Sequence, residues 1–324
     1  MKKKEKKLKN ASTSRRKFLK TLSGAAASVV VFGSCQGTSG NPDQGETRPT
    51  TYGPRAGAGN PYVNSEGKPI LVCVEGSDFD EMLLRGLDAI GGLHKLVNNN
   101  QAVLIKPNLF EKSQYPWISS LTSITSIIQA VKQVSSGTVN VGDMSFEETS
   151  AVYDYLGIED AVNNAGGTLL RFSQVYKVRR DSWPSSKPDF SVYADVYDTP
   201  VLINTPVLKR HYISSLTCAI KCNVGTIRGS GTTGTRAYVH YNSNDFMAEL
   251  AEIAGLVKPD LNIVDARSIV TEIGPYYHQQ GPLVDTNKII ICADIVATDA
   301  YCARLMEEND DSFSVSNIRR TLER

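Results

Sequence analysis

The residues best suited to chemistry in this chain stand directly behind short apolar runs, where predicted β-strands end. The carboxyl ends of parallel strands meet at one edge of a sheet, so we expect these side chains to share one crevice. Lysines there suit an anionic group such as a phosphate or a carboxylate. Aspartate and histidine suit acid–base work or a divalent metal. The residues are Lys106, Asn108, Asp143, Lys209, His211 and Asp265.

We interpret the crevice as a site with three kinds of candidate residue. Taken singly, these residues also have an ordinary structural explanation. Asp265 could cap a turn, and His211 could be a surface histidine. The catalytic candidates are Lys209, His211, Asp143 and Asp265, and a divalent metal would be held by His211, His240 and Asp265. The candidates for binding an anion are Lys106, Asn108, Lys221, Asn223, Arg228 and Arg236.

A glycine-rich segment over 225–236 lies between Lys221 and His240. Glycines let backbone amides approach an anion closely, and Arg228 and Arg236 would add positive charge. No Gly-Lys-Ser/Thr follows, so the segment is not a Walker phosphate loop. We expect a mobile cover over the site, with a plain surface loop as the alternative.

Six cysteines are present, and their spacing does not predict a disulfide framework. Cys218 and Cys222 would share one face of a helix, where two thiolates could contribute to a metal site. Packing of that helix against a sheet is the simpler interpretation, with buried free thiols. No Cys-x2-Cys-x2-Cys run occurs, so an iron–sulfur cluster of that kind is not predicted.

Apolar strand patterns alternate with helical patterns from residue 70 onwards. This alternation predicts an α/β fold, with a mostly parallel sheet between two layers of helices. The segment 172–199 interrupts the alternation and predicts an inserted hairpin or lid, with a surface excursion as the alternative. Strands are expected over 70–74, 102–105, 138–141, 168–171, 201–203, 261–264 and 288–292, and helices over 82–97, 121–134, 150–164, 245–257 and 294–307.

Spaced sequence blocks resemble family 362 of the domains of unknown function. The resemblance covers most of 70–306 and implies an α/β domain of this length, without an established reaction. The blocks are Val103-Leu-Ile-Lys-Pro-Asn-Leu109, Val141-Gly-Asp143, Asn204-Thr-Pro-Val-Leu-Lys-Arg-His211, Ala219-Ile-Lys-Cys-Asn-Val-Gly225, His240, Lys258-Pro-Asp-Leu-Asn-Ile-Val-Asp265, Gly274-Pro275 and Ala293-Asp-Ile-Val-Ala-Thr-Asp299.

The chain begins with a basic leader that contains Arg15 and Arg16, followed by a mildly apolar run over 21–32. This layout is typical of a twin-arginine export signal, and the export machinery would be its partner. Small residues precede Cys35, so either lipidation of this cysteine or ordinary cleavage is expected. We predict a signal peptide over 1–35, a flexible linker over 36–61 and a single α/β domain over 62–324.

The net charge of +1 hides an uneven distribution. The first 20 residues carry ten basic side chains and one acidic side chain, which leaves the rest with a net charge of about −8. An acidic domain argues against nucleic acid as a partner. We therefore expect a protein of the periplasm or cell envelope, associated with a membrane only through its signal or a lipid.

Three functions fit these observations. The first is an exported enzyme, or a cofactor-dependent protein, that binds an anionic substrate or cofactor and a divalent metal in the crevice. The second is a non-catalytic surface lipoprotein that captures a ligand in the same crevice. The third is an accessory protein of a redox or cofactor-maturation system. The residues identify neither the cofactor nor the reaction.

Overall fold

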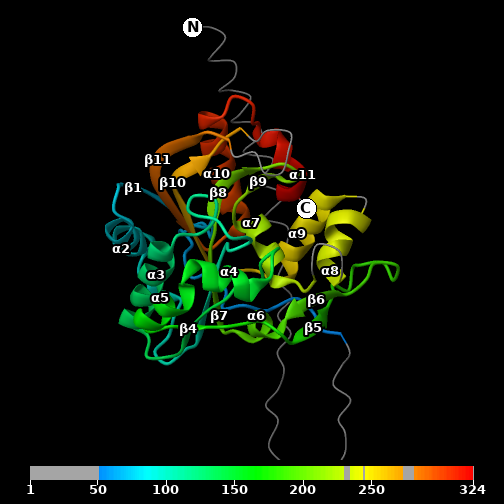
Figure 1. The fold of residues 1–324 in the computed structure, drawn as a ribbon, viewed down its shortest axis with the longest axis horizontal. Helices are drawn as coiled ribbons and strands as arrows, with labels where there is room; N and C mark the ends of the chain where they lie inside the picture. The colour runs from blue at the N-terminus through cyan, green and yellow to red at the C-terminus, as the bar shows by residue number, and fades with distance from the viewer. Residues whose placement is uncertain (1–50, 230–233, 244, 273–280, 324) are drawn as a thin grey trace, which may run out of the picture. The chain divides into compact units, whose positions relative to one another are not determined.

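A computed structural model describes residues 51–229, 234–243, 245–272 and 281–323 (Figure 1). Its main sheet contains β1 (Leu71–Glu75), β2 (Val103–Pro107), β3 (Val139–Val141), β4 (Thr168–Leu169), β7 (Val201–Thr205), β8 (Val207–His211), β9 (Ser215–Thr217), β10 (Leu261–Val270) and β11 (Leu283–Cys292). The α-helices are α2 (Phe79–Ile90), α3 (Leu121–Val134), α4 (Thr149–Leu156), α5 (Ile158–Asn164), α6 (Ala194–Asp198), α7 (Ala219–Cys222), α8 (Gly234–Ala237), α9 (Phe246–Leu256), α10 (Ile295–Asn309) and α11 (Arg319–Leu322).

The strand order is β1-β11-β10-β7-β2-β3-β4, with β8 paired to the far half of β10 and β9 paired to β8. The pairs from β10 to β4 are parallel, whereas β11 runs antiparallel to both β10 and β1. The predicted α/β fold with a mostly parallel sheet is therefore confirmed. Because β2, β3 and β7 run the same way, the residues behind their carboxyl ends come together.

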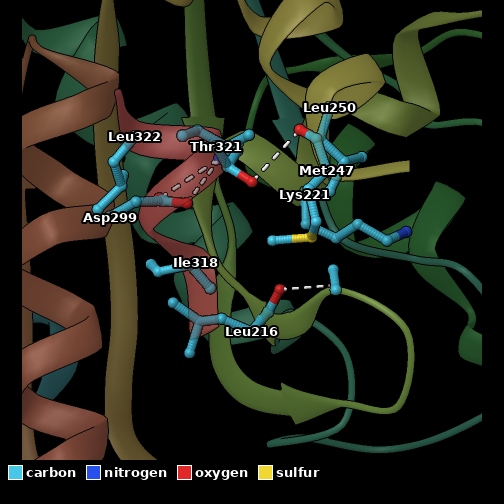
Figure 2. A pocket seen from close by; sticks show the side chains of 10 residues that line it. Leu216, Lys221, Met247, Leu250, Asp299, Ile318, Thr321 and Leu322 are labelled. Carbon is cyan, nitrogen blue, oxygen red and sulfur yellow. Dashed lines mark hydrogen bonds between the residues drawn. The ribbon is translucent and has the colours of Figure 1, made fainter. Parts of the chain in front are cut away.

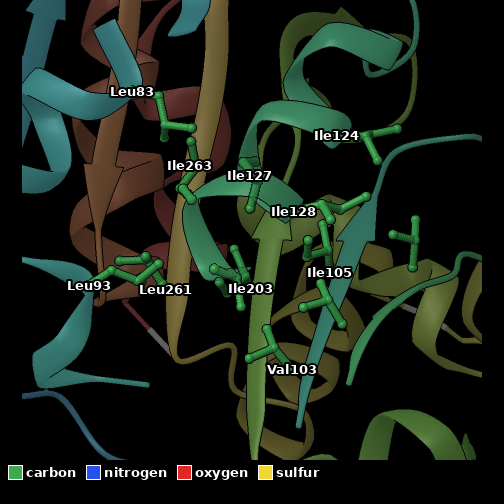
Figure 3. Close-up of a cluster of buried hydrophobic side chains, with 14 of the residues drawn as sticks. Leu83, Leu93, Val103, Ile105, Ile124, Ile127, Ile128, Ile203, Leu261 and Ile263 are labelled. Atoms are coloured by element: carbon green, nitrogen blue, oxygen red, sulfur yellow. The ribbon is translucent and has the colours of Figure 1, made fainter. Parts of the chain in front are cut away.

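Alternate residues of each central strand enter two separate cores. Val103 and Ile105 belong to the core that includes residues of α2, α3 and α5, while Leu104 between them belongs to the core on the other side. Figure 3 shows Ile124, Ile127 and Ile128 of α3 packed near the strand residues on the first side. Two apolar faces on one sheet require two helical layers, which gives the predicted three-layer arrangement.

Most predicted elements are present, and their ends follow capping residues. Asp78 and Asp294 accept hydrogen bonds from backbone amides of the first turns of α2 and α10, as N-caps do. The helix predicted over 150–164 is divided at Gly157 into α4 and α5. The helix predicted over 82–97 ends at Ile90 instead, because Gly91 adopts a left-handed conformation with φ of 110°.

The inserted segment 172–199 contains a hairpin, as predicted. β5 (Val175–Val178) and β6 (Phe190–Tyr193) pair antiparallel and form a second, two-stranded sheet. Phe190 and Val192 are fully buried in the second core. The hairpin is therefore packed into the domain, and the surface excursion is not what forms.

Residues 51–61, which belong to the linker predicted over 36–61, pack on the domain. Tyr52 exchanges backbone hydrogen bonds with Lys177 and Arg179 beside β5. Arg55 Nη2 lies 2.8 Å from Asp260 Oδ2 in a buried ion pair. The segment is anchored by a basic side chain. Its sequence therefore has no hydrophobic period from which this packing could be predicted. Residues 36–50 and the predicted signal over 1–35, with Arg15, Arg16 and Cys35, lie outside the described residues.

Within the described ranges, no helix combines the length and the apolar character needed to cross a bilayer.

Candidate functional site

A cavity of about 300 Å³ opens where β2, β3 and β8 end, and we call it the strand-end cavity. It contains seven of the residues predicted for the crevice. Its lining residues are Asn108, Phe110, Trp117, Asp143, Met144, Phe146, Lys209, Arg210, His211, Tyr212, Thr217, Lys221, Cys222, Val224, Gly225, Arg236, His240 and Tyr241.

A buried ion pair forms the base of this cavity. Lys106 Nζ lies 2.8 Å from Asp143 Oδ1, 3.1 Å from the Pro107 carbonyl oxygen and 3.3 Å from Cys222 Sγ. Burial opposes the charge on Lys106, but Asp143 and Cys222 outweigh it and raise the pKa of the lysine above its usual value. Lys106 therefore keeps its positive charge beside the Asp143 carboxyl group.

Glycine at position 225 lets the backbone lie against this ion pair. A Cβ atom there would overlap Asp143 Oδ1 and would lie 2.9 Å from Lys106 Nζ. Gly225 is therefore needed for the close approach of the backbone to the ion pair rather than for a turn.

Lys209, on β8, lies between two aromatic rings. Its Nζ is 3.9 Å from the ring centroid of Phe110 and 4.2 Å from that of Trp117, and it donates a 2.7 Å hydrogen bond to the Trp117 carbonyl oxygen. Burial away from water lowers the pKa of Lys209 to about 7. The aromatic faces and one carbonyl compensate the ammonium charge only in part.

Lys221, on α7, reaches into the same cavity. In the described part of the chain its Nζ has no hydrogen-bond or ion-pair partner, and its nearest ring is Phe246 at 5.9 Å. Its stem also lines a second, much smaller cavity beside Asp299, from which the ammonium points away (Figure 2). Burial first, and then the positive charge of Arg236, lower the pKa of Lys221 to about 7.

Two histidines add neutral rings to the cavity wall. The amides of Ile213 and Ser214 donate to His211 Nδ1, so the proton of the neutral ring is on Nε2. His240 Nδ1 lies 2.7 Å from the Arg236 carbonyl oxygen, which places its proton on Nδ1. Burial lowers the pKa of both rings, to about 4 for His240. At neutral pH one ring therefore offers a donor and the other an acceptor.

Two further polar groups complete the interior. Arg236 is 6% exposed, and its Nη1 donates to the carbonyl oxygens of Met144 and Ser145. The hydroxyl of Thr217 is buried on the wall with no hydrogen-bond partner among the described residues. An unpartnered buried hydroxyl is costly, which favours a ligand that accepts from it.

Asp265 does not join the cavity, contrary to the prediction. β10 continues past Val264 to Val270, so Asp265 lies inside a strand rather than behind one. Its carboxylate binds Arg267 Nη2 at 2.8 Å and the Tyr115 hydroxyl at 2.9 Å. The predicted set of His211, His240 and Asp265 is therefore not assembled, and no group of three His, Cys, Asp or Glu side chains suited to a metal occurs in the part described.

Two predicted anion-binding residues also lie elsewhere. Asn223 is buried and donates to the Val257 carbonyl oxygen at 2.8 Å, which ties α7 to the end of α9. Arg228 is exposed and does not line the cavity. Residues 230–233 of the glycine-rich segment, like Gly274-Pro275, lie outside the described residues, so the expected cover stays a prediction.

Cys218 and Cys222 occupy different surroundings and form no joint site. Burial, then Cys302 and Asp299, raise the pKa of Cys218 well above its usual value, whereas Cys222 contacts Lys106. Burial raises the pKa of Cys222 to about 11, so both are thiols at neutral pH. The packing interpretation describes them better.

The sequence reasoning missed the aromatic walls. Phe110 and Trp117 belong to the loop between β2 and α3, and Tyr212 directly follows His211. The available signal was the run of aromatic residues in loops behind strand ends. The aromatic lining residues are Phe110, Trp117, Phe146, Tyr212 and Tyr241.

Comparisons with known proteins find a matching family and similar chains. The sequence model of the family described as "Domain of unknown function (DUF362)" matches residues 103–304, well over half of the chain. The Thylakoid-associated protein sll1697 of Synechocystis sp. is 24% identical over 222 residues, covering 66% of this chain and 67% of that protein. The lactate racemase apoprotein from Thermoanaerobacterium thermosaccharolyticum aligns with a TM-score of 0.46 and 11% identity, over 61% of this chain and 50% of that chain.

Proposed function

The chain belongs to the DUF362 family, and on this premise we propose that it is an exported α/β protein that binds a small anionic substrate or cofactor in the strand-end cavity. The observation that carries the proposal is the imbalance of charge on the wall. Lys209, Lys221 and Arg236 are cationic groups, whereas the one acidic lining residue in the described part, Asp143, is already paired with Lys106.

An anion would correct this imbalance. Its charge would favour the protonated forms of Lys209 and Lys221, whose pKa values of about 7 reflect the loss of water. Arg236 would hold part of a phosphate or carboxylate, and the Thr217 hydroxyl would donate to it. Each of these interactions is missing in the unliganded protein, so binding would supply them.

A proton could be moved within the same cavity. The neutral His211 ring carries its proton on Nε2, while His240 has a free acceptor at Nε2. These opposite roles are compatible with an enzyme, and equally with a binding protein that orients a ligand by hydrogen bonds. Among the residues that the structure describes, no three-ligand metal site forms, so no step is assigned to a metal.

The site of action follows from the leader. We propose export through the twin-arginine route by Arg15 and Arg16, with Cys35 as the point of a lipid anchor. The name of the Synechocystis relative associates that protein with a membrane system. Replacing both arginines by lysine is expected to leave the protein in the cytoplasm, as fractionation of the producing cells would reveal; unchanged export would contradict this route.

Calorimetric titration of the purified domain with inorganic phosphate and with acetate tests the ligand class. We expect one of these anions to bind, and Lys221→Met to weaken it about tenfold or more, because one charge-assisted contact is lost. The exposed Lys95→Met is the matched control and should bind normally. If neither anion bound, or if Lys221→Met changed nothing, the proposal would be wrong.

A non-catalytic surface lipoprotein remains the second candidate function, because the cavity has the donors and acceptors to hold a ligand without turning it over. Tight binding without conversion of any tested ligand would favour it. The accessory role in a redox or cofactor-maturation system would be favoured by visible absorption of the protein as isolated.

A further inference from the structure

The strand-end cavity changes in character from its interior to its mouth. Its polar interior groups are nearly inaccessible, with Lys209 3%, Thr217 2% and Arg236 6% exposed. Its aromatic side chains at the mouth are instead largely exposed to solvent, with Phe146 48%, Tyr212 50% and Tyr241 64% exposed. Lys209 and Arg236 are therefore deep, Lys221 is partly buried, and the large apolar surfaces are outermost.

This concentration of exposed rings is unusual for a protein surface. In the described part of the chain four Phe and Tyr side chains are exposed, and three of them line this one cavity. Exposed apolar side chains are ordinary when scattered singly, but a group around a cavity marks a binding surface. The remaining one, Tyr155, lies on α4 outside the cavity and supplies a natural control.

The rings connect the two zones in space. The Tyr212 ring stacks on His211, with centroids 5.1 Å apart and planes 19° apart. On another side of the cavity, Tyr241 lies next to His240, with centroids 6.1 Å apart. Tyr212 and Tyr241 thus each adjoin a neutral imidazole that lines the cavity. A flat ligand group entering from the mouth would meet aromatic faces before its charge reached the lysines.

Resting on the proposed anion-binding function, we infer that the ligand is an aromatic anion. Its phosphate or carboxylate lies among Lys209, Lys221 and Arg236, and its ring lies on Phe146, Tyr212 and Tyr241. A simple anion would use only the interior. The cavity of about 300 Å³ is at the small end of ligand sites, which suits one or two rings with a single charged group.

Calorimetry with inorganic phosphate, phenyl phosphate and cyclohexyl phosphate tests this inference. We expect phenyl phosphate to bind at least tenfold more tightly than phosphate, and more tightly than the equally apolar but non-planar cyclohexyl ester. The combined variant Phe146→Ala, Tyr212→Ala, Tyr241→Ala should lose this advantage and keep its affinity for phosphate. Tyr155→Ala should behave like the natural chain.

The outcomes separate this inference from the binding function beneath it. Equal affinity for phosphate and both esters would overturn the aromatic ligand and leave anion binding standing. For a ligand that carries a carboxylate, acetate and benzoate provide the same comparison between a simple anion and an aromatic one. No binding of any of these anions would overturn both. Attachment of the folded domain to anionic lipid vesicles through the same three rings, with no preference for phenyl phosphate, would make the mouth a membrane contact and would also overturn the inference.

Discussion

Lys106 on β2 and Asp143 behind β3 form an ion pair of 2.8 Å in which both side chains are less than 5% exposed. The two strands are neighbours in parallel register, with Ile105 opposite Val141. Because register fixes which residues follow each strand, the fold itself brings this lysine to this aspartate. The pair then supports the cavity by contacts to Pro107, Cys222 and the Leu109 amide.

Removing one member of this pair should destabilise the protein strongly. Asp143→Asn leaves the Lys106 charge buried without its partner, which typically costs about 3–5 kcal/mol. The combined change Lys106→Met, Asp143→Leu should recover much of that loss. Denaturation by urea measures both. The exposed pair of Lys68 and Glu66 provides the control, since Lys68→Met should have little effect; equal losses in the two variants would contradict a buried pair.

Anion affinity should fall as the pH rises through about 7. Lys209 and Lys221 have pKa values lowered to about 7 in the unliganded protein, so each must take up a proton to attract an anion above that pH. With sulfate, whose charge is constant from pH 5 to 9, affinity should drop by up to about tenfold per pH unit for each lysine involved. Titrations across this range measure the slope, which should decrease in Lys209→Met. A constant affinity from pH 6 to 9 would refute the role of both lysines.

Lys221→Met should make the unliganded protein more stable while it weakens anion binding. The folded pKa of about 7 lies below the unfolded value of 10.5, so the charged form pays a burial cost that is complete below pH 7. That cost shrinks as the pH rises towards 10.5. We expect a gain of about 1–4 kcal/mol near pH 6, the range seen when buried ionic groups are replaced by apolar ones. Thermal unfolding at pH 6 and pH 9 checks it, and a gain that grew with pH would contradict the sign.

Arg55→Met should destabilise the domain although the residue lies near its amino-terminal edge. Besides its ion pair with Asp260, the guanidinium donates 2.8 Å hydrogen bonds to the carbonyl oxygens of Thr199 and Lys258. Loss of these contacts leaves the Asp260 carboxylate buried with only amide donors, at a cost of about 3–5 kcal/mol. Arg85→Met, in an exposed pair with Glu81, is the control. Chemical denaturation of both variants decides; a loss no larger than that of the control would show that 51–61 is dispensable.

The fold could be predicted because apolar runs and helical spacing report burial directly. Lys106, Asp143 and Lys209 were found because each follows such a run, and parallel strands end at one edge. Asp265 was assigned to the crevice on the same ground, because it also follows an apolar run. Its strand continues beyond Val264 as an antiparallel pair with β11, where alternating polar residues hide the strand from an apolar pattern.

The aromatic mouth and the anchor at Arg55 could not be predicted from local sequence. Tyr212 and Tyr241 gain their meaning from being neighbours across a cavity, although 29 positions separate them in the chain. Arg55 and Asp260 are 205 positions apart. Neither pairing follows from a periodicity, because both depend on where the finished topology brings distant loops.

The packing of residues 51–61 also limits how far the domain can stand from a lipid surface. If Cys35 carries a lipid, only residues 36–50 lie between it and the packed segment. At about 3.3–3.6 Å per residue, a chain of this length spans at most roughly 50 Å. A domain that began at Tyr62 would have a longer reach.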